Sequence, residues 1–290
     1  MDFHLIAAQL LNGVALGAIL ALVALGLTIV FGLLGFVNFA HGAIFTCGAY
    51  GGWVVYTKTG SFVIAIAAAL ATAFVIGVVI ERLLIRMFYN RPPEDQILVT
   101  FGLAIVLVEL VRALFTGQTQ LLPTPSWGQG IVNVGGIFYP QYRLEVVGIV
   151  AVTLAAIYII IYRTKIGLIV RAGIDDPLVV NLLGIDVKRT FLLVFAMGAA
   201  LAGLAGIIDS PMLAVNPDMG TEVLAQSFVV IVIGGVGSFG GAIVGGLIAG
   251  ELVSLTTLFA PDYSQVFLYV AMALVLILRP KGLFGVEGRA

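Results

Sequence analysis

Long runs without a charged side chain recur along this chain. No Asp, Glu, Lys or Arg occurs from Leu5 to Thr57, from Thr59 to Ile80 or from Val223 to Gly250. About 20 consecutive apolar residues are enough to cross the roughly 30 Å hydrocarbon core of a bilayer. The runs therefore predict helices that span a membrane.

The apolar pattern divides into nine predicted membrane segments. The second and seventh are short for a full crossing, which suits re-entrant helices whose irregular ends are buried in protein. We therefore expect an all-α integral membrane protein, a polytopic bundle of about 8–9 segments with some short or re-entrant. The segments are Leu5–Phe31, Ala43–Tyr56, Ser61–Leu84, Ile97–Phe115, Leu144–Tyr162, Thr190–Ile208, Val223–Gly235, Ala242–Phe259 and Tyr263–Leu278.

The basic residues predict an orientation. With nine segments, three groups of basic residues fall on one side of the membrane and hold 11 of the 14 in the chain. Short cytoplasmic loops carry the excess of Lys and Arg. We therefore expect the N-terminus outside and the C-terminus in the cytoplasm. The groups are Arg82, Arg86 and Arg91; Arg163, Lys165, Arg171, Lys188 and Arg189; and Arg279, Lys281 and Arg289.

Composition agrees with a lipid environment and excludes several function classes. Hydrophobic residues make up 61% of the chain and charged residues only 10%, whereas soluble domains carry about a quarter charged residues. The net charge of −1 gives no electrostatic reason to expect nucleic acid as a partner. The single cysteine, Cys47, cannot form an internal disulfide, and we expect it to be a packing residue.

No motif predicts a cofactor, a metal site or a soluble-enzyme active site. His41 has no second His or Cys at ligand spacing, and the hydrolase and metalloprotease motifs are absent. A phosphate-binding loop requires a lysine directly after a glycine, and none of the four lysines has one: Lys58, Lys165, Lys188 and Lys281. Energy for transport would have to come from another protein.

Several polar residues lie within the predicted segments, where they are costly and commonly functional. Glu109 and Arg112 are three residues apart and are expected to form a structural ion pair. Glu251 lies nearer the middle of its segment. It could join two helices through a hydrogen bond, line a polar path or bind a coupling proton. Glu81 adjoins Arg82 and is expected to be a solvated residue at the membrane edge.

Two connections outside the helices carry further polar and aromatic residues. In "GFVNFAHGA", Asn38, His41 and Gly42 lie where the chain breaks before a re-entrant helix. Their side chains could contact a translocated solute or satisfy the broken backbone. The connection from Thr116 to Arg143 is rich in proline and glycine, which excludes a long helix. Its aromatics suit the bilayer interface or a docking surface.

The segment "RTKIGLIVRAGIDDPLVVNLLGIDVKR" predicts a short helix between two spans. Asp176 is a candidate N-cap, Pro177 suits the first helical position and Gly184 suits the exit. Leu178, Val179, Leu182 and Leu183 would share one apolar face. Because a two-turn helix is marginal alone in water, this face must pack on the chain's own bundle or on a partner subunit.

Four stretches resemble one family. These are "GLIVRAGIDDPLVVNLLGIDV", "LNGVALGAILALVALGLTIVFGLLGFVNFAHGAIFTCGAY", "VIVIGGVGSFGGAIVGGLIAG" and "LILRPKGLFG". They are similar to bacterial branched-chain amino acid ABC transporter permeases of the LivH type, in the same order and over essentially the whole chain. Many relatives carry an acidic residue where this chain has Ala43. The resemblance implies a single transmembrane permease domain over residues 1–290.

The resemblance also implies partners and a coupling site. The partners would be a second homologous permease subunit, two cytoplasmic ATP-binding subunits and a periplasmic substrate-binding protein. The short helix would be the coupling helix that docks on an ATPase, and a possible translocation path would pass Asn38, His41, Gly42 and Glu251. The coupling residues would be Gly167, Arg171, Ala172, Asp176, Pro177, Leu178, Leu182 and Gly184.

The sequence therefore predicts a permease rather than an enzyme, located in the bacterial inner membrane. The leading hypothesis is an importer of branched-chain or related small amino acids that works by alternating access. Within the same family, urea, short amides and other small solutes are alternatives. A stand-alone secondary transporter with Glu251 or Glu109 as the coupling site, or a passive channel, would belong to a different class.

Overall fold

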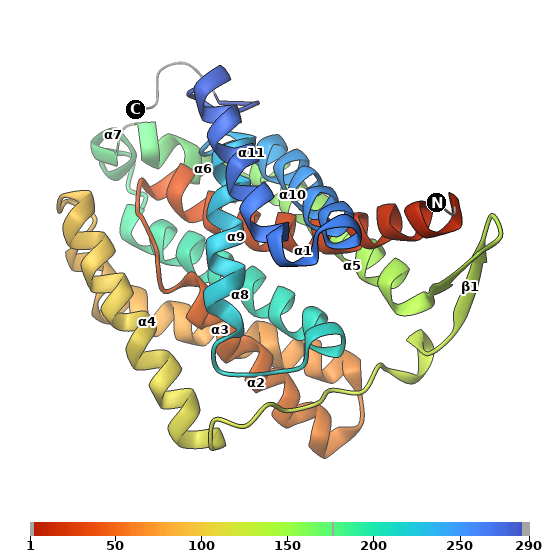
Figure 1. Ribbon diagram of the computed structural model, residues 1–290. Helices are drawn as coiled ribbons and strands as arrows, with labels where there is room; N and C mark the ends of the chain where they lie inside the picture. The colour runs from red at the N-terminus through yellow and green to blue at the C-terminus, as the bar shows by residue number, and fades with distance from the viewer. Residues whose placement is uncertain (1–2, 176, 286–290) are drawn as a thin grey trace.

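Helices make up most of the described chain, as the apolar pattern predicted. The computed structural model describes residues 3–175 and 177–285 (Figure 1). Seven of its helices are long and apolar enough to cross a membrane. The helices are α1 Phe3–Leu34, α2 His41–Thr59, α3 Phe62–Leu83, α4 Pro93–Phe115, α5 Gln141–Arg163, α6 Lys165–Asp175, α7 Pro177–Leu182, α8 Val187–Leu213, α9 Met219–Gly234, α10 Phe239–Phe259 and α11 Ser264–Leu278.

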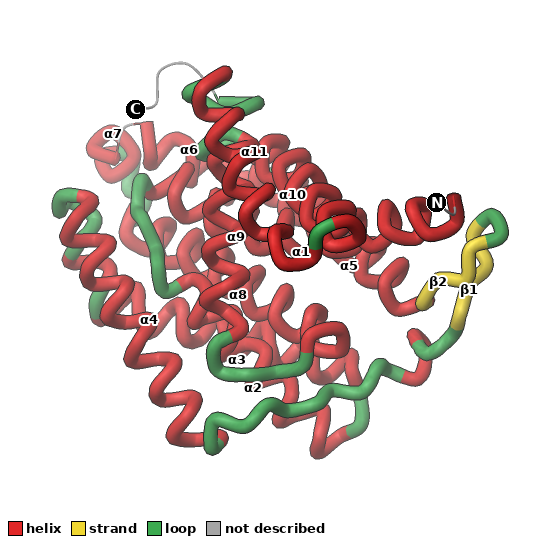
Figure 2. Tube along the Cα trace, viewed as in Figure 1, coloured by secondary structure: helices red, strands yellow, loops and turns green. Residues whose placement is uncertain are grey.

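The nine predicted segments correspond to α1–α5 and α8–α11. The expected break before the second segment is confirmed, because residues 35–40 are not helical between α1 and α2. In Figure 2 this linker runs back alongside α4 before α2 begins. The seventh segment is the 16-residue α9, the shortest of the nine except for the 15-residue α11.

Two ends of the bundle are distinguished by their connections. The start of α1 and a β-hairpin lie at one end, called here the hairpin end (Figures 1 and 2). Helices α6 and α7 and the end of α11 lie at the other, called the α6–α7 end. The described members of the three basic groups flank the ends of α3, α5 and α11 and the start of α8, all at the α6–α7 end, and Arg289 lies outside the described residues.

The Thr116–Arg143 connection contains no long helix, as expected. It forms the hairpin from β1 (Ile131–Val134) and β2 (Ile137–Pro140), which pair antiparallel with Val132 opposite Tyr139. Gly135 and Gly136 between the strands both have positive φ, which a tight hairpin turn requires. The rest of the connection is tied to the bundle by Gln120, whose backbone pairs with that of Val215.

Glycine lets α1 and α10 pack backbone against backbone. A Cβ atom at Gly246 would lie 2.7 Å from the Cα of Ala21, and one at Gly17 would lie 2.9 Å from the carbonyl oxygen of Gly246. Lipid tails are as apolar as leucine, so helices in a membrane associate through such close contacts rather than through burial from water. Helix α1 is consequently the most enclosed of the spanning helices.

A second glycine contact joins the starts of α2 and α9. The second segment was expected to be short, but α2 has 19 residues because the helix extends beyond both predicted ends. A Cβ atom on Gly42 of α2 would collide with the backbone of Gly220 in α9, and the reverse also holds. The N–H of Gly220 donates to Oγ1 of Thr46, 3.1 Å away. The starts of α2 and α9 therefore pack backbone against backbone, and protein cover of this kind is what lets irregular backbone occur at membrane depth.

Two expectations about the α6–α7 end are wrong or incomplete. Glu81 is not solvated but fully buried, because the chain after α3 folds back and brings Arg86 to within 3.2 Å of its carboxylate. The sequence also predicted only the helix that is now α7 and missed α6. The missed signal is the spacing of Ile166, Ile169 and Val170, which are three and four residues apart and so fall on one face of a helix. In the structure this face is directed toward α8.

Alanine at two glycines of α10 should have opposite effects. Gly240→Ala should leave stability unchanged or raise it by about 0.5–1 kcal/mol, because nothing lies within 4 Å and helical glycine is unfavourable. Gly246→Ala should destabilise by about 1–3 kcal/mol through overpacking against Ala21. Thermal unfolding of the two purified variants in one detergent measures the difference. Equal melting temperatures would contradict the close α1–α10 contact.

Candidate functional site

Helix α7 begins and ends where the sequence predicted. Its first residue is Pro177, and Asp176, the expected N-cap, lies outside the described residues. Gly184 has φ of +81°, and its N–H donates to the carbonyl of Asn181 at 2.9 Å. Glycine tolerates this left-handed conformation without a Cβ penalty. The exit at Gly184 is therefore confirmed.

The end of α7 presents an apolar surface that no other part of the described residues covers. Leu182 is 78% exposed and Leu183 is 72% exposed, whereas Val180 is buried. Two leucines side by side at the end of a short helix, beside a cluster of basic residues, have no packing role within the described chain. Such an exposed apolar pair is typical of a contact with another molecule.

Arg171 and Gly167 fix α6 to the end of α5. The Arg171 guanidinium donates to the carbonyl oxygen of Ile161 and lies 5.5 Å from the centre of the Tyr162 ring, a cation–π distance. A Cβ atom at Gly167 would collide with that same carbonyl. Ala172 is half-buried. Arg171 and Gly167 therefore join α6 to a spanning helix, and they do not form an exposed face together with Leu182.

Asn38 stabilises the broken backbone before α2. Its Oδ1 accepts a hydrogen bond from the N–H of Ala40 at 3.0 Å. Two side chains of α4, which sequence reasoning missed, satisfy the neighbouring amides. Oε1 of Gln96 accepts from Val37 N–H at 3.1 Å, and Oγ1 of Thr100 accepts from Phe39 N–H at 3.0 Å. Polar residues at the start of an otherwise apolar helix were the available signal.

His41 lies deep in the contact between α1, α2 and α8. Its side chain is fully buried, with Nε2 3.2 Å from the carbonyl oxygen of Val23. It fills the space left by glycine, since a Cβ atom at Gly26 would lie 3.0 Å from the imidazole. Gly42 packs directly against the backbone of Gly220. Solute contact by Asn38, His41 and Gly42 stays a prediction.

Glu251 lies on α10 against Gly13 of α1, a glycine where any side chain would collide with the carboxylate. Its Oε2 is buried and has no hydrogen-bond partner among the described residues. One turn further on, Ser254 donates to the carbonyl of Gln9 at 2.7 Å. The hydrogen bond that joins α1 and α10 here is therefore made by Ser254. A role for Glu251 in lining a polar path or binding a coupling proton stays a prediction.

The ion pair predicted in α4 is confirmed. Arg112 contacts Glu109 at 2.6 Å and also Asp218, directly before α9, at 2.5 Å. All three side chains are partly exposed, so the pair contributes little stability. It ties the C-terminal end of α4 to the start of α9. Glu109 is therefore engaged by its own chain.

Glu81, Arg86 and Tyr89 form a buried polar cluster where the chain turns from α3 to α4. The Glu81 carboxylate accepts from the Arg86 guanidinium at 3.2 Å and from the Tyr89 hydroxyl at 3.4 Å. Burial, and then the negative charge of Glu81, raise the pKa of Tyr89. Tyr89 therefore stays protonated and continues to donate.

Within residues 3–175 and 177–285, no group of three or more His, Cys, Asp or Glu could hold a metal ion.

Comparison with protein families matches nearly the whole chain. Residues 9–276 match the model of the branched-chain amino acid transport system permease component. The chain belongs to this family. It is a multi-pass membrane permease of an ABC importer, a class that acts with ATP-binding and substrate-binding partners, and the resemblance seen in the sequence is confirmed.

Individual relatives agree over almost their full length. The chain is 31% identical to the high-affinity branched-chain amino acid transport permease LivH of Escherichia coli, covering 96% of this chain and 94% of the relative. It is 28% identical to BraD of Pseudomonas aeruginosa, covering 96% and 95%. It is also 28% identical to a probable LivH of Methanocaldococcus jannaschii, covering 93% and 89%.

Removing Arg86 should destabilise the protein more than removing its exposed neighbour. Arg86→Met leaves the Glu81 carboxylate buried without its cation. Because the Arg86 side chain is itself about a third exposed, the cost should be about 1–2 kcal/mol, below that of a fully buried pair. Arg82→Met should cost less than about 0.5 kcal/mol. Thermal unfolding in detergent compares them, and equal losses would contradict the buried pair.

Proposed function

We propose that this permease carries branched-chain or related small amino acids across the inner membrane. Relatives with this activity in their names align over nearly the whole chain, which supports the substrate class. Urea, short amides and other small solutes remain the alternatives within the family. The expected assembly joins this chain to a second homologous permease, two cytoplasmic ATP-binding subunits and a periplasmic substrate-binding protein.

The exposed leucine pair at the end of α7 is the observation that supports docking of an ATP-binding subunit on this chain. Leu182 and Leu183 are largely exposed at the end of the bundle that also holds the basic groups. An ATP-binding subunit would cover them, which explains why a short helix ends in uncovered apolar residues. By the excess of Lys and Arg in cytoplasmic loops, this end is cytoplasmic. The N-terminus and the hairpin then lie outside and the C-terminus inside.

Coupling would run from α7 through α6 into the bundle. ATP drives transport only by binding one conformation of its subunits better than the other. A shift of α7 on the ATPase would pull α6, which Arg171 and Gly167 fix to the end of α5. Because α5 is a spanning helix, this movement reaches the membrane and can alternate access between the two sides.

A stand-alone secondary transporter has less support. Of its two candidate coupling carboxylates, Glu109 is paired with Arg112. Only Glu251 retains a buried oxygen without a hydrogen-bond partner among the described residues. A proton-coupled mechanism would then rest on Glu251 alone.

Reconstitution distinguishes the two mechanisms. In proteoliposomes holding the full complex and the loaded binding protein, leucine uptake should require ATP. Uptake should fall to background when the ATP-binding subunits are omitted. Accumulation by this chain alone, driven by a proton or sodium gradient, would overturn the proposal. The measured quantity is radiolabelled leucine retained per vesicle.

Substitutions at Leu182 and Arg171 should both reduce transport, for different reasons. Leu182→Asp should lower uptake at least about tenfold and release the ATP-binding subunit, without changing the melting temperature of the isolated chain, because Leu182 touches little of it. Arg171→Ala should also lower that melting temperature, because the Ile161 carbonyl loses its donor. The control near α7 is Lys188→Asp, which changes an exposed side chain and should leave uptake and the bound ATP-binding subunit unchanged.

Full uptake by Leu182→Asp, with the ATP-binding subunit still bound, would contradict the docking role of α7.

A further inference from the structure

A cavity of about 370 Å³ opens at the hairpin end, between α5, α8 and the connection that precedes α5. Its volume lies within the roughly 300–1,000 Å³ of small-molecule sites, near the small end. None of the residues predicted for coupling or translocation lines it. The side chains that line it include Thr124, Gln129, Ile131, Tyr142, Arg143 and Met212.

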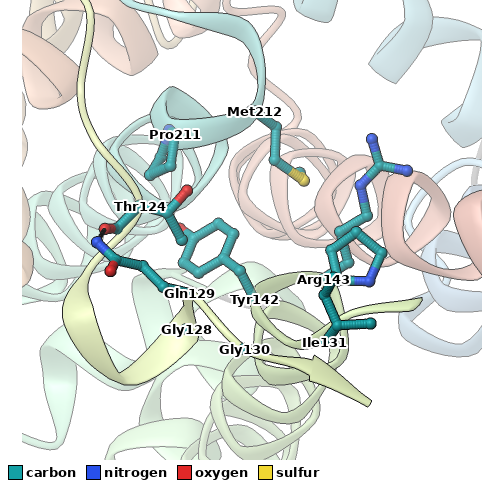
Figure 3. Close-up of a pocket in the computed structure, with 10 residues that line it drawn as sticks. Thr124, Gly128, Gln129, Gly130, Ile131, Tyr142, Arg143, Pro211 and Met212 are labelled. Carbon is teal, nitrogen blue, oxygen red and sulfur yellow. Dashed lines mark hydrogen bonds between the residues drawn. The ribbon is translucent and has the colours of Figure 1, made fainter. Parts of the chain in front are cut away.

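The lining side chains are divided by chemistry. Figure 3 shows Thr124, Gln129 and Tyr142 on one side of the cavity and Arg143 and Ile131 on the other. Met212 extends from the end of α8 between the two groups. The cavity thus has a hydroxyl and amide wall, a cationic wall, and apolar atoms between them.

Arg143 makes one wall suitable for a carboxylate. It lies in the first turn of α5, whose N-terminus has no side-chain cap. A helix N-terminus carries partial positive charge and unpaired N–H groups that favour an anion. The Arg143 guanidinium donates to Oδ1 of Asn12 in α1, which fixes its position. A guanidinium has five N–H donors, and this bond uses one.

Behind the opposite wall, two carboxylates each have one buried oxygen that lacks a hydrogen-bond partner among the described residues. Glu145 accepts from Gln141 at 2.7 Å through Oε1, while its Oε2, behind Gly128, is buried without a hydrogen-bond partner among the described residues. Asp209 likewise has a buried Oδ1 without a partner there. It adjoins Ile208, whose carbonyl accepts from the Tyr142 hydroxyl at 2.6 Å. This wall therefore favours a cation.

Aromatic contacts hold the Tyr142 wall in place. The Trp127 ring lies 6.0 Å from that of Tyr142, and the Phe62 ring is 5.8 Å from Trp127 and 6.1 Å from Tyr142. Such clusters, together with the Tyr142 hydrogen bond to α8, restrict side-chain motion. A ligand would find the site already formed, which reduces the entropy lost on binding.

We propose that this cavity binds a small zwitterionic amino acid at the outer face of the permease. The carboxylate lies at Arg143 and the start of α5, and the ammonium faces Thr124 and Gln129, with Glu145 and Asp209 behind that wall. The aliphatic side chain packs on Met212 and Ile131. The substrate class rests on the proposed function, whereas the opposed charges come from this site.

Direct binding to the assembled complex tests the site. The complex is held in nanodiscs without the binding protein, and radiolabelled L-leucine is added in equilibrium dialysis. Two competitors separate the charges: leucinamide lacks the carboxylate, and 4-methylpentanoate lacks the ammonium. Each should compete at least about tenfold more weakly than unlabelled leucine. Leucinamide leaves the Arg143 wall without an anionic partner, and 4-methylpentanoate leaves the Thr124 and Gln129 wall without a cationic one. Equal competition by all three compounds would overturn the proposal.

Variants place the binding in this cavity. Met212→Trp should fill the cavity and weaken leucine binding at least about tenfold, while Met212→Leu should keep it, because its volume and polarity are similar. The matched control is Leu213→Trp, one residue further on and 61% exposed, which should bind as the parent does. ATP hydrolysis by each complex verifies assembly. Parent-like leucine binding by Met212→Trp would overturn the proposal.

ATP-driven uptake distinguishes failure of the cavity from failure of the proposed function. If the parent complex imports leucine and Met212→Trp shows the same KM and kcat, the cavity is not a transport site and the proposed function stands. If the parent complex imports no branched-chain amino acid, the proposed function fails, whatever the dialysis shows. A raised KM in Met212→Trp, with kcat retained at saturation, supports both.

Discussion

Close backbone contact between helices is the constraint on which this structure depends. Within lipid there is no gain from burying apolar side chains away from water, so helices must approach closely enough for dispersion and polar contacts to hold them. Here α1 and α10 meet at Gly17 and Gly246, and α2 and α9 meet at Gly42 and Gly220. Because glycine contacts leave no room for adjustment, these four helices form a tightly joined central group.

This close packing determines where movement can enter the bundle. The central helices touch backbone against backbone at glycines, which leaves little space for them to shift, whereas α6 and α7 lie outside them and are joined to α5 through Arg171 and Gly167. A partner that moves α7 would therefore move α5 as a lever against the central group. The linker before α2 has its own attachment, through Gln96 and Thr100 of α4.

The sequence predicted the spans well because charge-free runs and glycine breaks are local signals. Placement of polar side chains was harder, because it depends on partners distant in the chain. Glu81 is buried only because the chain folds back and supplies Arg86, and Gln96 becomes a structural residue only once the linker returns to α4. The cavity at the hairpin end was missed for the same reason, since it joins Thr124, Arg143 and Met212 from three segments.

The central claim is that movement of an ATP-binding subunit is transmitted to this permease through α7. Photo-crosslinking tests it most directly, with a photoreactive residue in place of Leu182 in the assembled complex. Leu98, on the exposed face of α4, provides the matched position. The account predicts a crosslink from position 182 to an ATP-binding subunit and none from position 98. A complex that hydrolyses ATP and transports solute, yet gives no such crosslink at position 182, would contradict it.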